Sequence, residues 1–147
     1  MAKYLLIVDF QSGPDESPMS EWTDDEVAAH LNYYGRLNAE LTANGELVGG
    51  EVLTGPDLAK VVRSDGVTPV ITDGPFQEFK EWIAGYQIVD VESEARAIEI
   101  AAQISAVPGQ GGRPIAQPII VRQVMVDAPS NAVEMEAFLE TARGSIR

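Results

Sequence analysis

Apolar and polar positions alternate along the chain in a pattern that predicts a strand, a long loop and then a helix. Apolar residues fill most positions from Lys3 to Phe10, as in a buried first strand. Ser, Gly, Pro and Asp are concentrated from Gln11 to Glu21, which predicts a loop. Loops of this length between two elements often serve as lids or binding segments. Thr23, followed three residues later by Glu26, predicts a capping box at the start of the first helix.

The first predicted helix carries an apolar stripe and ends at a glycine. Residues at helical spacing form the stripe: Val27, Leu31, Tyr34, Leu37 or Asn38, and Leu41. Gly45 supplies the stop signal. Gly35, inside the helix, costs about 1 kcal/mol relative to Ala. We therefore expect Gly35 to pack closely against the sheet.

Shorter apolar runs separated by turn residues fill the middle of the chain. They predict, in order, a strand over Glu46–Thr54, a hairpin of Ala59–Arg63 and Val67–Thr72 around the turn Ser64-Asp65-Gly66, a short helix over Phe76–Ile83 ended by Gly85, and a strand over Tyr86–Val91. Together with the helix and strand that follow Val91, these elements give the order strand-helix-strand twice in succession. That order is what a split β-α-β architecture requires.

Another helix, a strand and a terminal helix complete the pattern. Ser93 caps a helix whose apolar side carries Ala97, Ile98, Ala101 and Ile104, and which ends at Pro108-Gly109. Gly109–Pro114 follows a helix instead of preceding one, so it is expected to be a flexible connector and not a phosphate-binding loop. Gln117–Val126 predicts a strand. Ser130–Arg143 predicts a helix with Val133, Phe138 and Leu139 on its apolar side, covering a sheet edge or a partner subunit.

Composition narrows the class of protein. The chain has 147 residues, which suits a single domain over 1–147 with residues 130–147 as a helical extension. Its net charge of -13 disfavours binding to a phosphate backbone, so no nucleic-acid partner is expected. Cysteine is absent, which excludes disulfides and thiolate sites. No apolar run has the length of a signal peptide core or a membrane span, so we expect a cytoplasmic protein without a membrane partner.

The most distinctive stretch runs from Val70 to Tyr86 and contains Asp73-Gly74-Pro75-Phe76. A strand should end there, because Pro75 has no amide proton for a ladder and Gly74 tolerates positive φ. With Glu78, Lys80-Glu81 and Gly85-Tyr86, this stretch resembles the signature of the YCII-related proteins, in their DGPF branch. The resemblance continues through Ser93 and its Ala-rich helix to Val121-Arg122, where Gln123 replaces the usual proline.

This resemblance implies a ferredoxin-like α+β fold, with an antiparallel sheet that has helices on one face. It also implies a homodimer in which two open sheet faces pack together, a dimeric α+β barrel. Most members of the family have no assigned activity. Family members are suspected of pairing a histidine of the first helix with the acid of the central motif, Asp73 in this chain. The family's histidine would fall at Tyr34 here, and His30, the only histidine, lies one turn earlier.

Three residues are therefore candidates for acid-base chemistry: Asp73, Tyr34 and His30. A carboxylate beside an imidazole would orient it and raise its basicity. Asp73 has a structural alternative, which is to cap the Gly-Pro bend. For His30 we favour a position on the solvated flank of the helix. The pair could also consist of Tyr34 with Asp73.

Four further residues are candidate ligand contacts: Trp22, Phe76, Lys80 and Tyr86. The aromatic residues could line a cleft between helix and sheet, although positions in the core or a dimer interface are commoner for such side chains. Lys80 could face an anionic ligand or pair with its acidic neighbours Glu78 or Glu81. We expect Asp73, Phe76, Tyr34, His30 and Trp22 to bound one pocket.

Two functional classes remain open at this stage. The first is a small-molecule-binding or accessory protein. The second is a cofactor-free enzyme that catalyses proton transfer or elimination on a small, for example aromatic, substrate. One histidine and no cysteine leave only a carboxylate site for a metal, and the acids do not follow a calcium-loop pattern, so neither a metal nor a cofactor is expected. The contacts of the Asp73 carboxylate distinguish the two classes.

Overall fold

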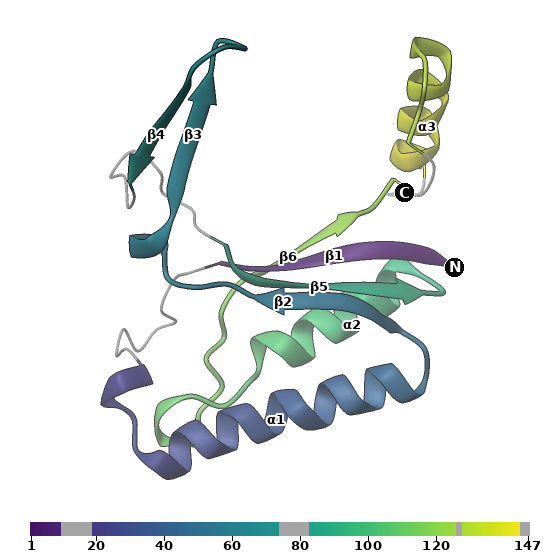
Figure 1. Cartoon of the computed structure of the whole chain (residues 1–147). Helices are drawn as coiled ribbons and strands as arrows, with labels where there is room; N and C mark the ends of the chain where they lie inside the picture. The colour runs from purple at the N-terminus through teal and green to yellow at the C-terminus, as the bar shows by residue number, and fades with distance from the viewer. Residues whose placement is uncertain (10–18, 74–82, 126–127, 145–147) are drawn as a thin grey trace.

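A four-stranded antiparallel sheet, covered on one face by two helices, forms the centre of the protein (Figure 1). The computed structural model describes residues 1–9, 19–73, 83–125 and 128–144. The strands lie in the order β2 (Leu47–Val52), β5 (Ile83–Val91), β1 (Ala2–Asp9) and β6 (Ile119–Gln123). The helices are α1 (Asp24–Ala43) and α2 (Glu94–Ser105). Strand-helix-strand occurs twice in this arrangement, so the predicted ferredoxin-like α+β fold is confirmed.

Two further elements stand away from this core. Strands β3 (Lys60–Ser64) and β4 (Pro69–Asp73) pair only with each other in the described chain, as the predicted hairpin between β2 and β5. Helix α3 (Ala132–Gly144) follows β6. Figure 1 shows that both the hairpin and α3 rise from the face of the sheet that α1 and α2 leave open. The described connections contain three short 3-10 helices, Met19–Glu21, Pro56–Leu58 and Gln110–Gly112.

The predicted caps at Thr23 and Ser93 and the stop at Gly45 are confirmed, whereas α2 ends at Ser105 and not at the predicted Pro108-Gly109. At the start of α1, the Glu26 amide donates to Thr23 Oγ1 over 3.2 Å and the Thr23 amide donates to Glu26 Oε1 over 3.0 Å. Ser93 caps α2 by accepting a bond from the Arg96 amide. Gly45 follows α1 with a φ of +80°, a conformation that glycine adopts without strain. In the described part of the chain, no helix is both long and apolar enough to cross a membrane.

The core lies between the sheet and the two helices. Its fully buried side chains come from strands, helices and the segment after α2: Leu6, Leu41, Val89, Val91, Ile100, Ile104 and Val107. The apolar stripes are rotated slightly from those predicted. Leu31 is 59% exposed and Ile98 is 54% exposed, so their assignment to the apolar sides was wrong. The isoleucine of α2 that faces the core beside Ala97 and Ala101 is Ile100 and not Ile98.

Two glycines have different roles from those predicted. Gly35 is exposed and a Cβ built there meets nothing within 4 Å, so close packing does not explain it. Gly85 does not end a helix, because it lies within β5 opposite Val8. There a Cβ would come within 3.0 Å of the Glu51 carbonyl oxygen on β2. The predicted helix over Phe76–Ile83 lies outside the described residues except for Ile83, which begins β5.

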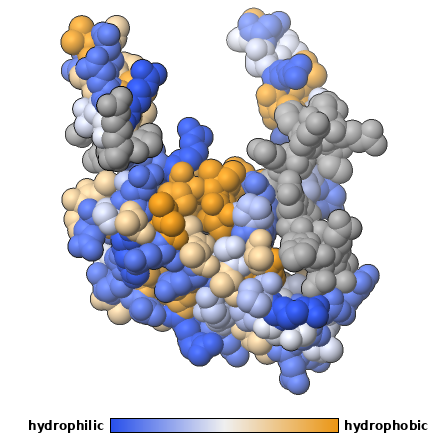
Figure 2. Space-filling view, turned by 180° about the vertical axis from the view of Figure 1, so that it is seen from behind, coloured by the Kyte–Doolittle hydropathy of each residue, from blue (hydrophilic) through white to orange (hydrophobic). Residues whose placement is uncertain are grey.

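The open face of the sheet is apolar at its centre. Side chains alternate between faces along a strand, so the neighbours of core residues point away from the helices. The ladder registers place five such residues together: Leu5, Ile7, Tyr86, Ile88 and Ile120. Ile7 is only 8% exposed, and the other four are half-buried. An apolar patch lies between the hairpin and α3 on this side of the molecule (Figure 2).

Candidate functional site

Three aromatic rings meet at the start of α1. The His30 and Tyr34 rings lie one helical turn apart, with centroids separated by 5.3 Å and planes inclined by 61°. Trp22, just before the helix cap, also contacts His30, with a centroid distance of 5.4 Å and an angle of 69°. All three residues are half-buried. Edge-to-face contacts of this kind stabilise aromatic clusters, and here they hold the imidazole between two larger rings.

A backbone carbonyl fixes the orientation of the imidazole. His30 Nδ1 lies 2.9 Å from the oxygen of Pro108, which follows α2. A carbonyl oxygen only accepts hydrogen bonds, so Nδ1 carries the proton and donates it. In the neutral ring, Nε2 is then the acceptor. The prediction that His30 lies on the solvated flank of the helix is therefore wrong.

The loop that provides this carbonyl, predicted as a flexible connector, is a turn with its own hydrogen bonds. The Gly109 amide donates to the Arg113 carbonyl over 2.7 Å, and the Gly111 amide donates to Glu26 Oε2. Glu26 thus binds both its own helix cap and the loop. These hydrogen bonds lower the pKa of its carboxyl, and the bond from the Thr23 amide contributes most. The start of α1 and the turn after α2 are joined at several points around His30.

The Tyr34 hydroxyl is suited to donate a proton in a hydrogen bond and not to act as a base. Burial, with a smaller contribution from Tyr33, raises the pKa of the Tyr34 phenol above its ordinary value. The hydroxyl therefore stays protonated at neutral pH. Tyr33 is used differently, since its hydroxyl donates to the Gln103 carbonyl over 2.7 Å and ties α1 to α2.

The Asp73 carboxylate lies on the hairpin, where it pairs with a lysine. Its Oδ1 is 2.6 Å from Lys60 Nζ, and both side chains are strongly exposed, at 79% and 62%. The hydrogen bond and the charge of Lys60 lower the pKa of this carboxyl. Among the described residues no hydrogen bond connects Asp73 with His30 or Tyr34. Any bond from the carboxylate to the Gly-Pro bend falls outside the described part of the chain.

Of the remaining predicted ligand contacts, Tyr86 lies in the described part of the chain, away from His30. Tyr86 pairs with Ile7 on the open face of the sheet, whereas the aromatic cluster lies on the helix side. Phe76 and Lys80 lie outside the described residues. The structure thus brings together Trp22, His30 and Tyr34 of the predicted pocket.

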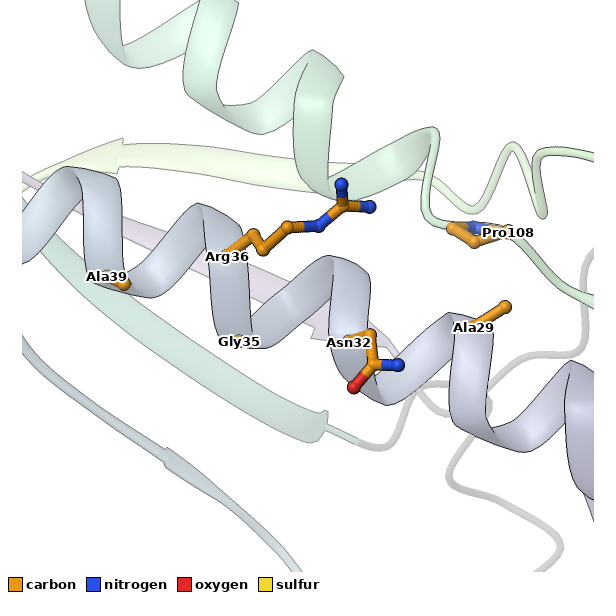
Figure 3. A pocket seen from close by; sticks show the side chains of 6 residues that line it. All are labelled: Ala29, Asn32, Gly35, Arg36, Ala39 and Pro108. Carbon is orange, nitrogen blue, oxygen red and sulfur yellow. The ribbon is translucent and has the colours of Figure 1, made fainter.

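A shallow hollow on the surface of α1 adjoins the cluster (Figure 3). Its lining consists of small side chains and two polar ones: Ala29, Asn32, Gly35, Arg36, Ala39 and Pro108. Figure 3 shows that the Arg36 side chain extends toward the end of α2. Pro108, on the other rim, is also the residue whose carbonyl binds His30. The hollow therefore contains one cation, Arg36, and shares Pro108 with the surroundings of His30.

Sequence reasoning missed two contacts of the candidate residues. Lys60 lies opposite Asp73 because β3 extends to Ser64 and β4 begins only at Pro69, so the turn is longer than predicted. A count across this longer turn would have identified the pair. The Pro108 carbonyl could not have been found in this way, because a backbone oxygen has no side-chain signal in the sequence.

Two comparisons with known proteins concern the family of this chain. A family model described as "YCII-related domain" matches residues 3–113. An uncharacterized protein of Rhizobium meliloti (strain 1021) is 28% identical over 106 residues, which cover 69% of this chain and 86% of that protein. Among the residues that the structure describes, no three potential metal ligands form a cluster. Since the matched region includes the whole four-stranded sheet except β6, together with α1 and α2, the chain belongs to the YCII-related domain family.

Proposed function

We propose that this protein is a small-molecule-binding or accessory protein of the DGPF branch. Its ligand site is the cluster of Trp22, His30 and Tyr34, together with the adjoining turn at Pro108. The ligand class that this chemistry favours is a small aromatic molecule with a hydrogen-bond donor. The two flanking rings provide edge-to-face surfaces, and His30 Nε2 provides the acceptor.

The contact made by Asp73 is the observation that favours binding over catalysis. An acid-base pair requires its two groups within hydrogen-bond reach or separated by one water. The carboxylate binds Lys60 on an exposed hairpin, while the imidazole binds the Pro108 carbonyl. The carboxylate of the expected acid-base pair is thus held by another partner, and the imidazole atom that it would orient, Nδ1, is bound to a carbonyl instead.

Phenol and anisole provide a direct test of the ligand class. Phenol can donate to His30 Nε2, whereas its methyl ether has the same ring and no donor. We expect phenol to shift the imidazole proton resonances of His30, which are unambiguous because the chain has one histidine. Anisole should bind roughly twofold to tenfold more weakly, the value of one neutral hydrogen bond.

Tyr33→Phe is the matched control, because Tyr33 is a neighbouring aromatic residue whose hydroxyl binds the Gln103 carbonyl. This variant should keep the preference for phenol. Equal affinity for phenol and anisole, or resonance shifts that leave His30 unaffected, would contradict the proposed ligand class.

Catalysis without a cofactor is the second candidate function. One observation favours it: the Pro108 carbonyl fixes the tautomer of His30, as an orienting group does for a general base. In this case the enzyme would transfer a proton or eliminate a group from a small aromatic substrate. His30→Gln would then abolish incorporation of solvent deuterium into the substrate, whereas loss of binding without any such exchange would leave only the first function.

We also propose that two copies pack through their open sheet faces. The apolar residues Leu5, Ile7 and Ile88 at the centre of this face support a dimer (Figure 2). A stable interface of standard size buries about 1,600 Å² in total. The arrangement corresponds to a dimeric α+β barrel, in which the helices of both copies remain on the outside.

A further inference from the structure

The β3–β4 hairpin and helix α3 form two arms that have little packing within their own chain. Among the described residues, neither β3, β4 nor α3 contains a buried side chain. Both arms extend from the open face of the sheet, on either side of its apolar patch (Figures 1 and 2). Their positions do not follow from the packing of the core.

Elements of this size are weakly stable unless something covers them. A single two-stranded hairpin is marginal in water, and helices below about 12–15 residues are marginal as well. Both arms also expose large apolar side chains. On the hairpin these are Val62, Val70 and Ile71, which are 60%, 59% and 61% exposed, and on α3 they are Val133, Met135 and Leu139, which are 77%, 40% and 42% exposed.

The apolar side of α3 is continuous. Met135, Phe138 and Leu139 follow the i, i+3, i+4 spacing of one helical face. Glu136 and Glu140 lie one turn apart beside this stripe. The helix thus presents an apolar stripe with an acidic flank.

The hairpin has the complementary chemistry. Strand β3 carries two cations, of which Lys60 is paired with Asp73. Arg63 lies opposite Val70 and on the same face as Val61, so one face of the hairpin combines valines with a cation. An apolar helix with acidic flanks would cover those valines and place its glutamates near Arg63.

We propose that α3 of each protomer packs on the β3–β4 hairpin of its partner. This inference depends on the proposed dimer through the open sheet face. The two arms of one chain stand on opposite sides of the apolar patch (Figure 2). A two-fold axis that is parallel to the sheet and perpendicular to the line joining the arms then places each α3 beside the partner's hairpin. The contact occurs twice and encloses the sheet-to-sheet interface.

Cross-linking between two variants, each with a single cysteine at a different position, tests this contact. The protein has no cysteine, so Val70→Cys and Leu139→Cys each introduce a single reactive thiol. The two full-length variants are mixed, allowed to exchange subunits and treated with a short bismaleimide. We expect a covalent heterodimer of Val70→Cys with Leu139→Cys. Replacing Leu139→Cys by Thr42→Cys, at the exposed end of α1, should give at least tenfold less product.

Sedimentation of the same samples separates the two proposals. A dimer that gives no Val70–Leu139 cross-link above the Thr42 control would overturn the packing of the arms and leave the sheet dimer standing. A monomer at micromolar concentration would overturn both. In a second measurement, Arg63→Glu should weaken the dimer roughly twofold to tenfold, and adding Glu140→Arg should restore part of the loss. An unchanged dissociation constant in Arg63→Glu would count against the charge contact.

Discussion

At the scale of single residues, Arg96 and Glu46 show how the exposure of an ion pair determines its contribution to stability. Arg96 Nε and Nη2 each donate to one carboxylate oxygen of Glu46 over 2.9 Å, and the two side chains are 24% and 15% exposed. Arg96 also contacts Glu99 over 3.1 Å, but that carboxylate is 66% exposed. The bidentate pair connects α2 with the start of β2. This pair should contribute far more to the free energy of unfolding than the contact with Glu99.

Glu46→Gln should therefore lower the free energy of unfolding by about 1–3 kcal/mol, because a charged hydrogen-bonded pair is lost. Glu99→Gln is the matched control and should cost less than about 0.5 kcal/mol. Urea unfolding at neutral pH measures both. Equal losses would contradict the assignment of the structural role to the less exposed pair.

The same pair predicts a dependence on pH. The hydrogen bond from Arg96 lowers the pKa of Glu46 in the folded protein. A lowered folded-state pKa gives stability that is present above the unfolded-state value, about 4.3, and is lost as the pH falls through the folded-state value. The stability difference between the native protein and Glu46→Gln should therefore shrink below about pH 4. A difference that stays constant from pH 7 to pH 3 would contradict this.

At the scale of elements, two glycines should respond in opposite ways to the same substitution. A Cβ at Gly109 would lie 2.7 Å from Ile115 Cγ1 and 3.6 Å from Trp22 Cη2, in the turn that holds His30. A Cβ at Gly35 meets nothing within 4 Å, on the exposed side of α1. At Gly109 the effect of a larger side chain is therefore determined by the space available. At Gly35 it is determined by helix propensity.

Gly109→Ala should cost roughly 1–3 kcal/mol through overpacking, whereas Gly35→Ala should stabilise the protein by about 0.5–1 kcal/mol. Thermal or urea unfolding of the two variants provides the measurement. Stabilisation by Gly109→Ala would show that the turn does not pack against Trp22 and Ile115 as described.

Local signals determined which elements could be predicted from the sequence. The caps at Thr23 and Ser93 depend on residues three positions apart, so they are visible in one sequence. The exposed positions of Leu31 and Ile98 could not be predicted, because the rotation of a helix depends on what packs against it. Gly85 was misassigned for a similar reason, since its close neighbour is Glu51 on another strand.

The candidate site could be predicted only in part. His30 and Tyr34 share a helix face by their spacing, and Trp22 is near them in sequence, so their grouping could be anticipated. The Pro108 carbonyl lies 78 residues from His30 in the chain, and only the fold brings it there. Asp73 was placed in the pocket because of its motif. The hairpin that carries it stands on the other side of the sheet and supplies Lys60 instead.

At the scale of the whole molecule, the open sheet face determines the expected assembly. Its central residues are as apolar as those of a core, and the helices cover only the opposite face (Figure 1). We predict a dimer at micromolar concentration by light scattering. Leu5→Glu, at the centre of this face, should weaken the dimer at least a hundredfold, because a carboxylate would be buried without a partner.

Thr42→Glu adds the same charge at the exposed end of α1 and is the matched control. It should leave the dimer intact. A native monomer, or equal effects of the two substitutions on the dissociation constant, would contradict assembly through this face.

The central claim is that His30, and not Asp73, forms the ligand site. The most direct test is the dissociation constant for phenol, measured by NMR titration of the native protein and of two variants. For His30→Ala, followed through the Tyr34 ring resonances, we predict at least tenfold weaker binding. For Asp73→Asn we predict an affinity within twofold of native, because the carboxylate is engaged with Lys60 on an exposed hairpin. Unchanged binding in His30→Ala, or a tenfold loss in Asp73→Asn, would contradict this account.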